Sequence, residues 1–365
     1  MKKSAVIAVL LSVFIHMPAQ PESRSEEILS SLSEAERISQ IFLVNVEGNR
    51  SFSPVEFTDD GTPVVPGGIL LFSYNISDSF ESVKSFIGSV QSFCEKSGIV
   101  RPYIAVDQEG GSVSRLRGIT SFLPSEKKVA EQNSAQQAGN LYAVQAQQMK
   151  ELGITLNLAP VAEAVIDTNR EFLGNRTFGS VPSAVSYSMS CIQAYESNGI
   201  GCAVKHFPGN ANTDPHAGLP EIALSASEVE MYFLLPFAFV LRACPSCVLM
   251  SHARISSLDE NPAALSKFWI TEVLQRKLGY KGLVISDDIF MGALQDNGFP
   301  PEKACVQAIE AGVDIIMLSE KKFFHVAAVL LSRAEKDSAF AFRLYEAERK
   351  VIEFKLKKGI VHEAE

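Results

Sequence analysis

Eight short apolar segments alternate with amphipathic stretches along this chain, and this alternation is the strongest constraint on its fold. The segments cover residues 40–46, 67–73, 102–107, 154–160, 201–206, 247–252, 282–288 and 313–319. Strands that are apolar throughout and separated by helices are typical of a parallel sheet covered on both faces. The pattern therefore predicts an α/β fold, a single (β/α)8 TIM-type barrel, with any irregularity expected in the first strands.

The stretches between these segments carry helix signals. Apolar residues recur at helical spacing over Ala138–Leu152 and stop at Gly153, a residue type that often follows a helix. Ser225 and Glu228 have the spacing of a capping box. We find no internal repeat and no linker in mid-chain, so we expect one domain over residues 28–365.

The N-terminal residues have the order of a secretory signal. Lys2 and Lys3 precede an apolar run, residues 5–15, which is too short to span a bilayer comfortably. We predict that residues 1–19 are a signal peptide and that the protein is exported, periplasmic or extracellular. Met17 stands where a small residue is preferred before cleavage, so an uncleaved anchor is the alternative; otherwise no stable membrane insertion is expected.

The net charge of the chain excludes some classes of binding partner. A formal charge of −9 and a pI near 5.3 argue against nucleic acid or an anionic membrane surface, which require clustered Lys and Arg. Among the six cysteines, only Cys244 and Cys247 form a CxxC pair, and a zinc ribbon needs a second pair. We expect the cysteines to be small buried side chains, with one disulfide formed after export as the alternative.

Polar side chains stand at the carboxyl ends of the predicted strands. In a barrel these ends open on one face, where active sites lie, so residues far apart in sequence converge there. The polar residues at or within two residues of a strand end are Asp107, Asn157, Lys205, His206, His252 and Asp287.

The loop over residues 204–220 begins with Lys205 and His206 and continues to Asp214 and His216. The following proline disfavours a helical conformation at Asp214, and in an extended stretch residues two apart point to the same side. The carboxylate can then orient the imidazole of His216 for general acid catalysis. A single histidine in such a loop is more often simply exposed to solvent.

The strand at 282–288 ends in two adjacent carboxylates. Because adjacent side chains of a strand point to opposite faces, only one of them addresses the barrel mouth, and we assign that position to Asp287. A carboxylate there can attack an anomeric carbon, bind a metal or cap a helix. We assign Asp288 to capping the helix predicted to start at Met291.

The segment 104–118 adds a hydrogen-bond acceptor and a hydrogen-bond donor to the predicted site. Asp107 ends its strand, Gly110 and Gly111 allow a sharp turn, and Arg115 returns toward the same face. Such a pair suits the hydroxyls and acetamido group of a sugar.

Together these motifs resemble glycoside hydrolase family 3, in its β-N-acetylglucosaminidase (β-N-acetylhexosaminidase) branch. The resemblance covers about Ser33 to Leu318 and rests on KHFPG followed by Asp-x-His, and on Ser-Asp-Asp downstream. It is supported by NLAPVAEA at 157–164, GNRTFG at 174–179 and AIEAGVDIIML at 308–318. The Asp-x-His loop favours this branch over β-glucosidases that take their acid from a second domain.

The resemblance implies a retaining exo-β-N-acetylglucosaminidase that acts on carbohydrate, with peptidoglycan fragments as the expected source of terminal N-acetylglucosamine. It implies Asp287 as nucleophile, His216 as acid/base and Asp214 as the partner of that histidine, with no cofactor and no metal. The residues that match the family's sugar-binding set are Asp107, Arg115, Arg176, Lys205 and His206.

Three positions depart from the family pattern. Asn210 and Ala211 stand where the family usually has His and Gly, and Glu163 replaces a common Asp. The loop to the Asp-x-His pair also looks two residues shorter. These departures affect how far the loop can extend over the site and which leaving groups are accepted. The Asp214 and His216 pair itself is intact.

Other functions remain open at this point. A metal-dependent barrel hydrolase could use His206, His216, His252 and Asp287 as ligands, although such barrels typically carry an HxH motif that is missing here. An exported sugar-binding protein without catalysis is a second alternative. A β-glucosidase-type or phosphorolytic member of the family is a third, since a histidine acid/base does not repel phosphate as a carboxylate does.

Overall fold

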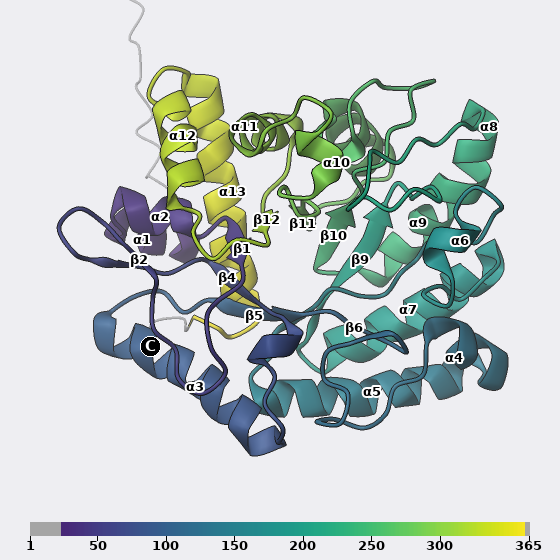
Figure 1. Cartoon of the computed structure of the whole chain (residues 1–365), viewed down its shortest axis with the longest axis horizontal. Helices are drawn as coiled ribbons and strands as arrows, with labels where there is room; N and C mark the ends of the chain where they lie inside the picture. Colours follow the sequence, from purple (N-terminus) through teal and green to yellow (C-terminus); the bar gives the residue numbers. More distant parts are fainter. Residues whose placement is uncertain (1–22, 362–365) are drawn as a thin grey trace, which may run out of the picture.

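Eight parallel strands form the centre of the protein in a computed structural model that describes residues 23–361. Figure 1 shows helices arranged around these strands. Each strand lies in its predicted segment, to within one residue. The strands are β1 (Phe42–Val44), β4 (Gly68–Leu71), β5 (Tyr103–Val106), β8 (Leu156–Asn157), β9 (Gly201–Phe207), β10 (Cys247–Met250), β11 (Leu283–Ile285) and β12 (Ile316–Leu318). Their order in the sheet is β11-β10-β9-β8-β5-β4-β1-β12.

The sheet closes between its two end strands. A parallel bridge joins Ile285 to Ile315, and the backbone N–H of Ser286 donates to the carbonyl of Ile315 at 3.0 Å. On the other side, β1 pairs with both β4 and β12. The predicted (β/α)8 barrel is therefore confirmed.

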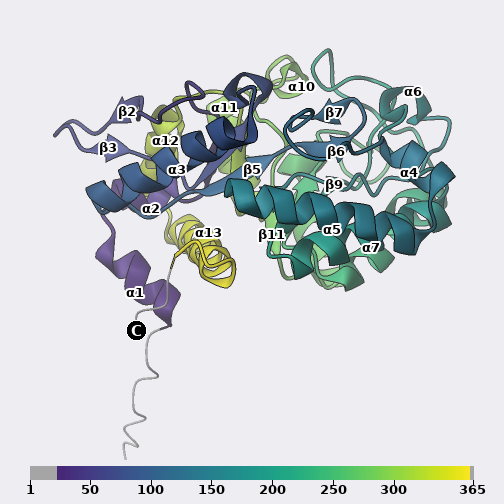
Figure 2. The same cartoon turned by 90° about the horizontal axis from the view of Figure 1, so that it is seen from below.

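Helices surround the barrel, and Figure 2 shows α5 and α7 packed side by side below the strands. The helices that follow strands are α3 (Phe80–Ser97), α5 (Ala135–Leu152), α7 (Val181–Ser197), α8 (Ala226–Glu228), α9 (Leu235–Val240), α11 (Pro301–Ala311), α12 (Phe324–Ala334) and α13 (Ser338–Lys357), with π-helices η2 (Val229–Leu234) and η5 (Phe268–Lys277). Gly153 ends α5 in the left-handed conformation, and Ser225 and Glu228 form the predicted capping box. Short helices in the loops are α4 (Glu126–Gln132), α6 (Arg170–Leu173) and α10 (Gly292–Gln295).

The expected irregularity lies between β1 and β4. No helix joins these strands; an antiparallel pair, β2 (Glu56–Phe57) and β3 (Pro63–Val64), occupies the connection. Two helices, α1 (Arg24–Ser31) and α2 (Glu34–Ser39), precede β1 instead. Ile28 and Leu29 of α1 pack against Ile352 of α13.

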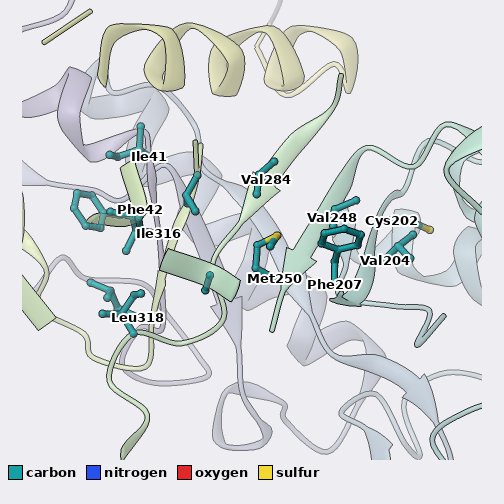
Figure 3. Close-up of a cluster of buried hydrophobic side chains, with 14 of the residues drawn as sticks. Ile41, Phe42, Cys202, Val204, Phe207, Val248, Met250, Val284, Ile316 and Leu318 are labelled. Carbon is teal, nitrogen blue, oxygen red and sulfur yellow. The ribbon is translucent and has the colours of Figure 1, made fainter. Parts of the chain in front are cut away.

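Alternate strand residues divide the core into an inner and an outer layer. Leu70, Ala105 and Leu249 belong to the inner cluster, which Phe354 of α13 also joins. Their neighbours along the strands pack outward against the helices, and Figure 3 shows part of this outer layer. A parallel barrel strand buries both faces, which explains why the strand segments are apolar without alternation.

The cysteines follow the prediction except at one position. Five are buried, and Cys244 is exposed. All six are free thiols, so the alternative of one disulfide is not realised in this structure. The predicted signal segment, residues 1–19, lies outside the described residues. Between residues 23 and 361, no helix is long and apolar enough to cross a membrane.

Candidate active site

A cavity of about 470 Å³ opens where the carboxyl ends of the strands meet. Leu70, Leu158, Leu249 and Met317 from the barrel interior contribute apolar lining. The lining includes every site residue that the sequence singled out: Asp107, Arg115, Arg176, Lys205, His206, Asp214, His216 and Asp287. The fold thus brings together residues that are up to 180 positions apart in the chain (287 − 107).

Two of the polar residues at strand ends serve the scaffold and do not line the cavity. The amide of Asn157 accepts from the backbone N–H of Gln108 at 3.0 Å and donates to its carbonyl at 3.1 Å. Nε2 of His252 lies 2.8 Å from the carbonyl oxygen of Asp288. Both side chains are fully buried, so they position the loops that carry the neighbouring carboxylates.

Buried ion pairs form one wall of the cavity. Lys205 Nζ lies 2.8 Å from Asp107 Oδ1 and 2.7 Å from Glu109 Oε1. Arg176 binds both oxygens of Glu109 at 2.9 Å in a bidentate pair. Burial alone would raise the pKa of Glu109, but the charges of Lys205 and Arg176 outweigh it and lower the pKa from 4.5 to about 2. Burial likewise opposes the charge on Lys205, yet the two carboxylates raise its pKa.

Glu109 is a functional-site residue that the sequence reasoning did not identify. It lies two residues beyond Asp107, on the short strand β6 (Gln108–Gly110), which pairs with β7 (Val113–Ser114). The sequence feature that could have identified Glu109 is a carboxylate in an EGG turn close to a strand end. Its role was not evident because Arg176, the partner in its bidentate ion pair, is 67 residues away in the chain. The turn itself requires glycine, because a Cβ on Gly110 (φ 103°) would lie 2.2 Å from the Pro124 carbonyl.

A second network holds His206. Its Nδ1 lies 2.7 Å from Glu163 Oε1, and its backbone N–H donates to the same oxygen at 3.2 Å. Asn210 donates twice to Glu163, and its own side-chain oxygen accepts from Ser251 Oγ at 2.9 Å. With Nδ1–H donated to the carboxylate, Nε2 of His206 is left as the nitrogen that can meet a ligand.

Asp214 and His216 are in contact, as predicted, but not by the predicted geometry. The backbone turns at this point: the N–H groups of Ala217 and Gly218 both donate to the Asp214 carbonyl. Asp214 Oδ1 accepts from the His216 backbone N–H at 2.9 Å and lies 2.8 Å from its Nδ1. The expectation of an extended stretch is wrong, because the aspartate side chain stabilises a local turn. These hydrogen bonds from His216 lower the pKa of Asp214.

The loop that carries this pair rests on α10. The backbone N–H of Ala293 donates to the Pro215 carbonyl at 3.0 Å. A Cβ on Gly292 would lie 3.1 Å from the carbonyl oxygen of His216, so the glycine permits this close approach. The side chain of His216 is still 72% exposed, and it lies over the cavity rather than within the core.

Asp287 and Asp288 have different environments. Asp287 lines the cavity and is 8% exposed, and its Oδ1 accepts from the backbone N–H of Asp288 at 2.9 Å. Asp288 does not cap α10 as predicted. Its Oδ1 accepts from the backbone N–H groups of Phe290 at 3.1 Å and Ser319 at 2.9 Å, which ties the loop to the end of β12. Burial raises the pKa of Asp288.

The four residues named for a metal-dependent hydrolase are engaged separately. His206 is bound to Glu163, His216 is bound to Asp214, and His252 contacts a backbone carbonyl. Asp287, the fourth, accepts from the backbone N–H of Asp288. In the part of the chain that the structure describes, no three His, Cys, Asp or Glu side chains are grouped to hold a metal ion.

The sequence profile described as glycosyl hydrolase family 3 N terminal domain matches residues 36–353. The chain belongs to this family. The predicted family and its glycosidase class are therefore confirmed.

Two curated relatives and one solved structure illustrate the likeness. The β-hexosaminidase A of Pseudoalteromonas piscicida is 30% identical over 69% of this chain, which covers 45% of that relative's length. The β-hexosaminidase of Idiomarina loihiensis is 30% identical over 69% of this chain and 76% of its own. A family-3 β-N-acetylglucosaminidase structure from Paenibacillus superposes with a TM-score of 0.83 at 24% identity, over 92% of this chain and 64% of that one.

Proposed function

We propose that the protein is a retaining exo-β-N-acetylglucosaminidase that removes terminal N-acetylglucosamine from glycans. One observation supports this most strongly: a buried carboxylate, Asp287, and a histidine–carboxylate pair, His216 and Asp214, reach the same cavity from separate loops. This arrangement brings a nucleophile and a proton donor to one cavity, as a double displacement requires. The names of the curated relatives, β-hexosaminidases, agree with the proposed sugar.

The reaction proceeds in two displacements. Asp287 attacks the anomeric carbon while His216 gives a proton to the glycosidic oxygen, so the bond to the leaving sugar breaks and a glycosyl-enzyme forms. His216 then takes a proton from water, which attacks the same carbon and releases Asp287. Two inversions at one carbon leave the product with the configuration of the substrate.

Asp214 acts on this chemistry through the histidine ring. Its carboxylate lies at hydrogen-bond distance from Nδ1 of His216, which fixes the tautomer and directs Nε2 to the substrate. The carboxylate also favours the protonated imidazole that the first step requires. Because the pKa of Asp214 is lowered, its charge is retained in mildly acidic solution.

The ion-pair wall and Arg115 are suited to bind the terminal sugar. Asp107 uses one oxygen for Lys205 and keeps further acceptor capacity for a hydroxyl. Arg115 Nε is buried without a hydrogen-bond partner in the described structure, and the residue lines the cavity. A buried donor that lacks a partner in the free protein is satisfied by a ligand acceptor such as an acetamido oxygen.

We further propose that the protein is exported and that its substrates are peptidoglycan fragments. The N-terminal order of charge, apolar run and small residues supports export. An exported location together with the β-hexosaminidase names of the relatives supports peptidoglycan fragments as the source of terminal N-acetylglucosamine.

Covalent trapping tests the proposal. A slow N-acetylglucosaminyl fluoride should label the protein, and peptide mass spectrometry should place the sugar on Asp287. The hydrolysis product should first appear as the β-anomer by NMR. Label on another residue, or an α-anomer as first product, would contradict the mechanism. Adding phosphate and looking for a sugar 1-phosphate separates hydrolysis from phosphorolysis.

A further inference from the structure

The side chain of Asn212 joins the loop of His216 to the loop that contains α6. Its Oδ1 accepts from the backbone N–H groups of Glu171 and Phe172 at 2.9 and 3.4 Å. Its Nδ2 donates to the carbonyl of Asp167 at 2.9 Å. Phe172 and His216 both line the cavity, so Asn212 links two loops that border the same space.

These hydrogen bonds cap α6 from outside its own segment. The first N–H groups of a helix have no partner within it, and the residue that precedes the helix often supplies an acceptor. Asn169 occupies that position, but its fully buried side chain is engaged elsewhere: it accepts from the Ile166 backbone N–H and donates to the Ala164 carbonyl. Asn212 supplies the acceptor that Asn169 does not.

The α6 segment is anchored independently of Asn212. Leu173 is buried, and its carbonyl accepts from the backbone N–H of Arg176 at 2.8 Å. The Arg176 guanidinium is held by both oxygens of Glu109 and lies 5.7 Å from the Phe172 ring centroid. The segment that carries Phe172 and Arg176 to the cavity is therefore the fixed side of the contact.

The loop over residues 211–219 has few other contacts with the barrel. The Pro215 carbonyl accepts one hydrogen bond, from the backbone of α10. The hydrogen bonds of Asp214 stay within the turn, so they orient the imidazole of His216 relative to the loop but do not fix the loop relative to the barrel. Within the described structure, Asn212 is the only residue of this loop whose side chain forms a hydrogen bond with another segment.

We propose that Asn212 is a positioning residue that holds His216 in register with the terminal sugar. This inference rests on the proposed function and adds how its acid/base is placed. A general acid must lie within hydrogen-bond reach of the glycosidic oxygen, and a displacement of about 1 Å can remove much of its effect. Asn212 does not itself line the cavity, so it acts on the reaction through the position of His216.

The test compares two substrates of the full-length protein. The leaving sugar of N,N′-diacetylchitobiose requires protonation, whereas the fluoride of N-acetylglucosaminyl fluoride departs without an acid. The readout is the ratio of kcat/KM for the disaccharide to kcat/KM for the fluoride. Both constants report the first displacement, and their ratio does not depend on the amount of folded protein. Asn212→Ala should lower this ratio about threefold to tenfold, the change expected for the loss of one ordinary hydrogen bond.

Two further variants separate the contact from a general effect on the loop. Asn212→Asp keeps the acceptor for the two backbone N–H groups, so it should lower the ratio less than Asn212→Ala does. Thr213→Ala is the matched control, because Thr213 is the next residue of the loop, is exposed and does not line the cavity. This control should leave the ratio unchanged.

An unchanged ratio in Asn212→Ala overturns the proposal, even if both constants fall in equal proportion, because the residue then supports only the fold. An equal fall of the ratio in Thr213→Ala overturns it as well. If the unmodified protein turns over neither substrate, the proposed function fails and the inference with it. If it turns over both and the ratio is independent of Asn212, only the inference fails.

Discussion

Glu163 and Asn210 are joined by two hydrogen bonds, from the Asn210 backbone N–H to Oε2 at 2.7 Å and from its side-chain Nδ2 to Oε1 at 3.0 Å. These are two of the positions at which the sequence departs from the family pattern. Because the two side chains are in direct contact, we expect the longer acid and the shorter amide to compensate for each other. The same carboxylate orients His206, so the exchange keeps the ligand-facing ring nitrogen in place.

The first prediction concerns this pair. Glu163→Gln replaces the charged acceptor of the His206 Nδ1–H, and kcat/KM should fall about tenfold to a hundredfold, because hydrogen bonds to charged groups contribute about 1.5–3 kcal/mol. Glu163→Asp and Asn210→His should each lower activity, and the double variant should recover part of the loss. Additive effects of the two substitutions in a double-mutant cycle would contradict the reciprocal exchange.

The second prediction separates the roles of His216. His216→Ala should lower kcat on N,N′-diacetylchitobiose about a hundredfold to ten-thousandfold, the usual contribution of a general acid. Fluoride leaves without protonation, so the first step on the glycosyl fluoride should persist while the second slows. The glycosyl-enzyme should then accumulate and appear as an added sugar mass on the intact protein. His325→Ala serves as control, because His325 does not line the cavity.

The third prediction follows from the lowered pKa of Glu109. Between about pH 4.5 and 2 the unfolded state binds a proton at this residue and the folded state does not. The contribution of Glu109 to the free energy of unfolding should therefore be complete above pH 4.5. It should decrease as the pH drops toward 2, by at most about 3 kcal/mol in total. Glu109→Gln should flatten that part of the profile.

At neutral pH the same variant should also be less stable by about 3–5 kcal/mol, since it leaves two buried cations without their shared carboxylate. Urea unfolding across this pH range measures both effects. Glu272→Gln, in an exposed ion pair with Arg276, is the comparison and should change stability by less than about 1 kcal/mol. Equal effects of the two substitutions would contradict the assignment of Glu109 to a buried network.

The fourth prediction concerns Lys355 at the opposite end of the barrel. Its Nζ donates to Gln40 Oε1 at 2.6 Å and lies 6.0 Å from the Tyr103 ring centroid. Burial lowers the pKa of Lys355 from 10.5 to about 7. Between these pH values the unfolded state holds a proton at Lys355 that the folded state has released. The free energy of unfolding therefore increases as the pH rises, by up to about 1.4 kcal/mol per pH unit.

Lys355→Met removes this titration and should flatten the stability profile between pH 7 and 10. Chemical denaturation at several pH values measures it. A profile as steep as that of the unmodified protein would show that Lys355 is not the group responsible.

Local patterns in the sequence were sufficient for the barrel strands, for α5 with its end at Gly153, and for the gathering of Asp107, Lys205 and Asp287 at one face. Strand and helix periodicity depend on nearest neighbours, and in a closed parallel barrel every strand ends on the same side. Once the strands are assigned, the position of these three residues at one face follows, and no individual side-chain contact needs to be known.

Tertiary structure alone decided the roles of Glu109 and Glu163 and the turn at Asp214. The partners of Glu109 lie 67 and 96 positions away (176 − 109 and 205 − 109), and Glu163 meets Asn210 across 47 positions. The sequence determined which side chains would reach the mouth of the barrel. Which of them are paired, buried or left free for a ligand depends on long-range packing, because a carboxylate acquires its partner and its pKa only when folding brings both groups out of water together.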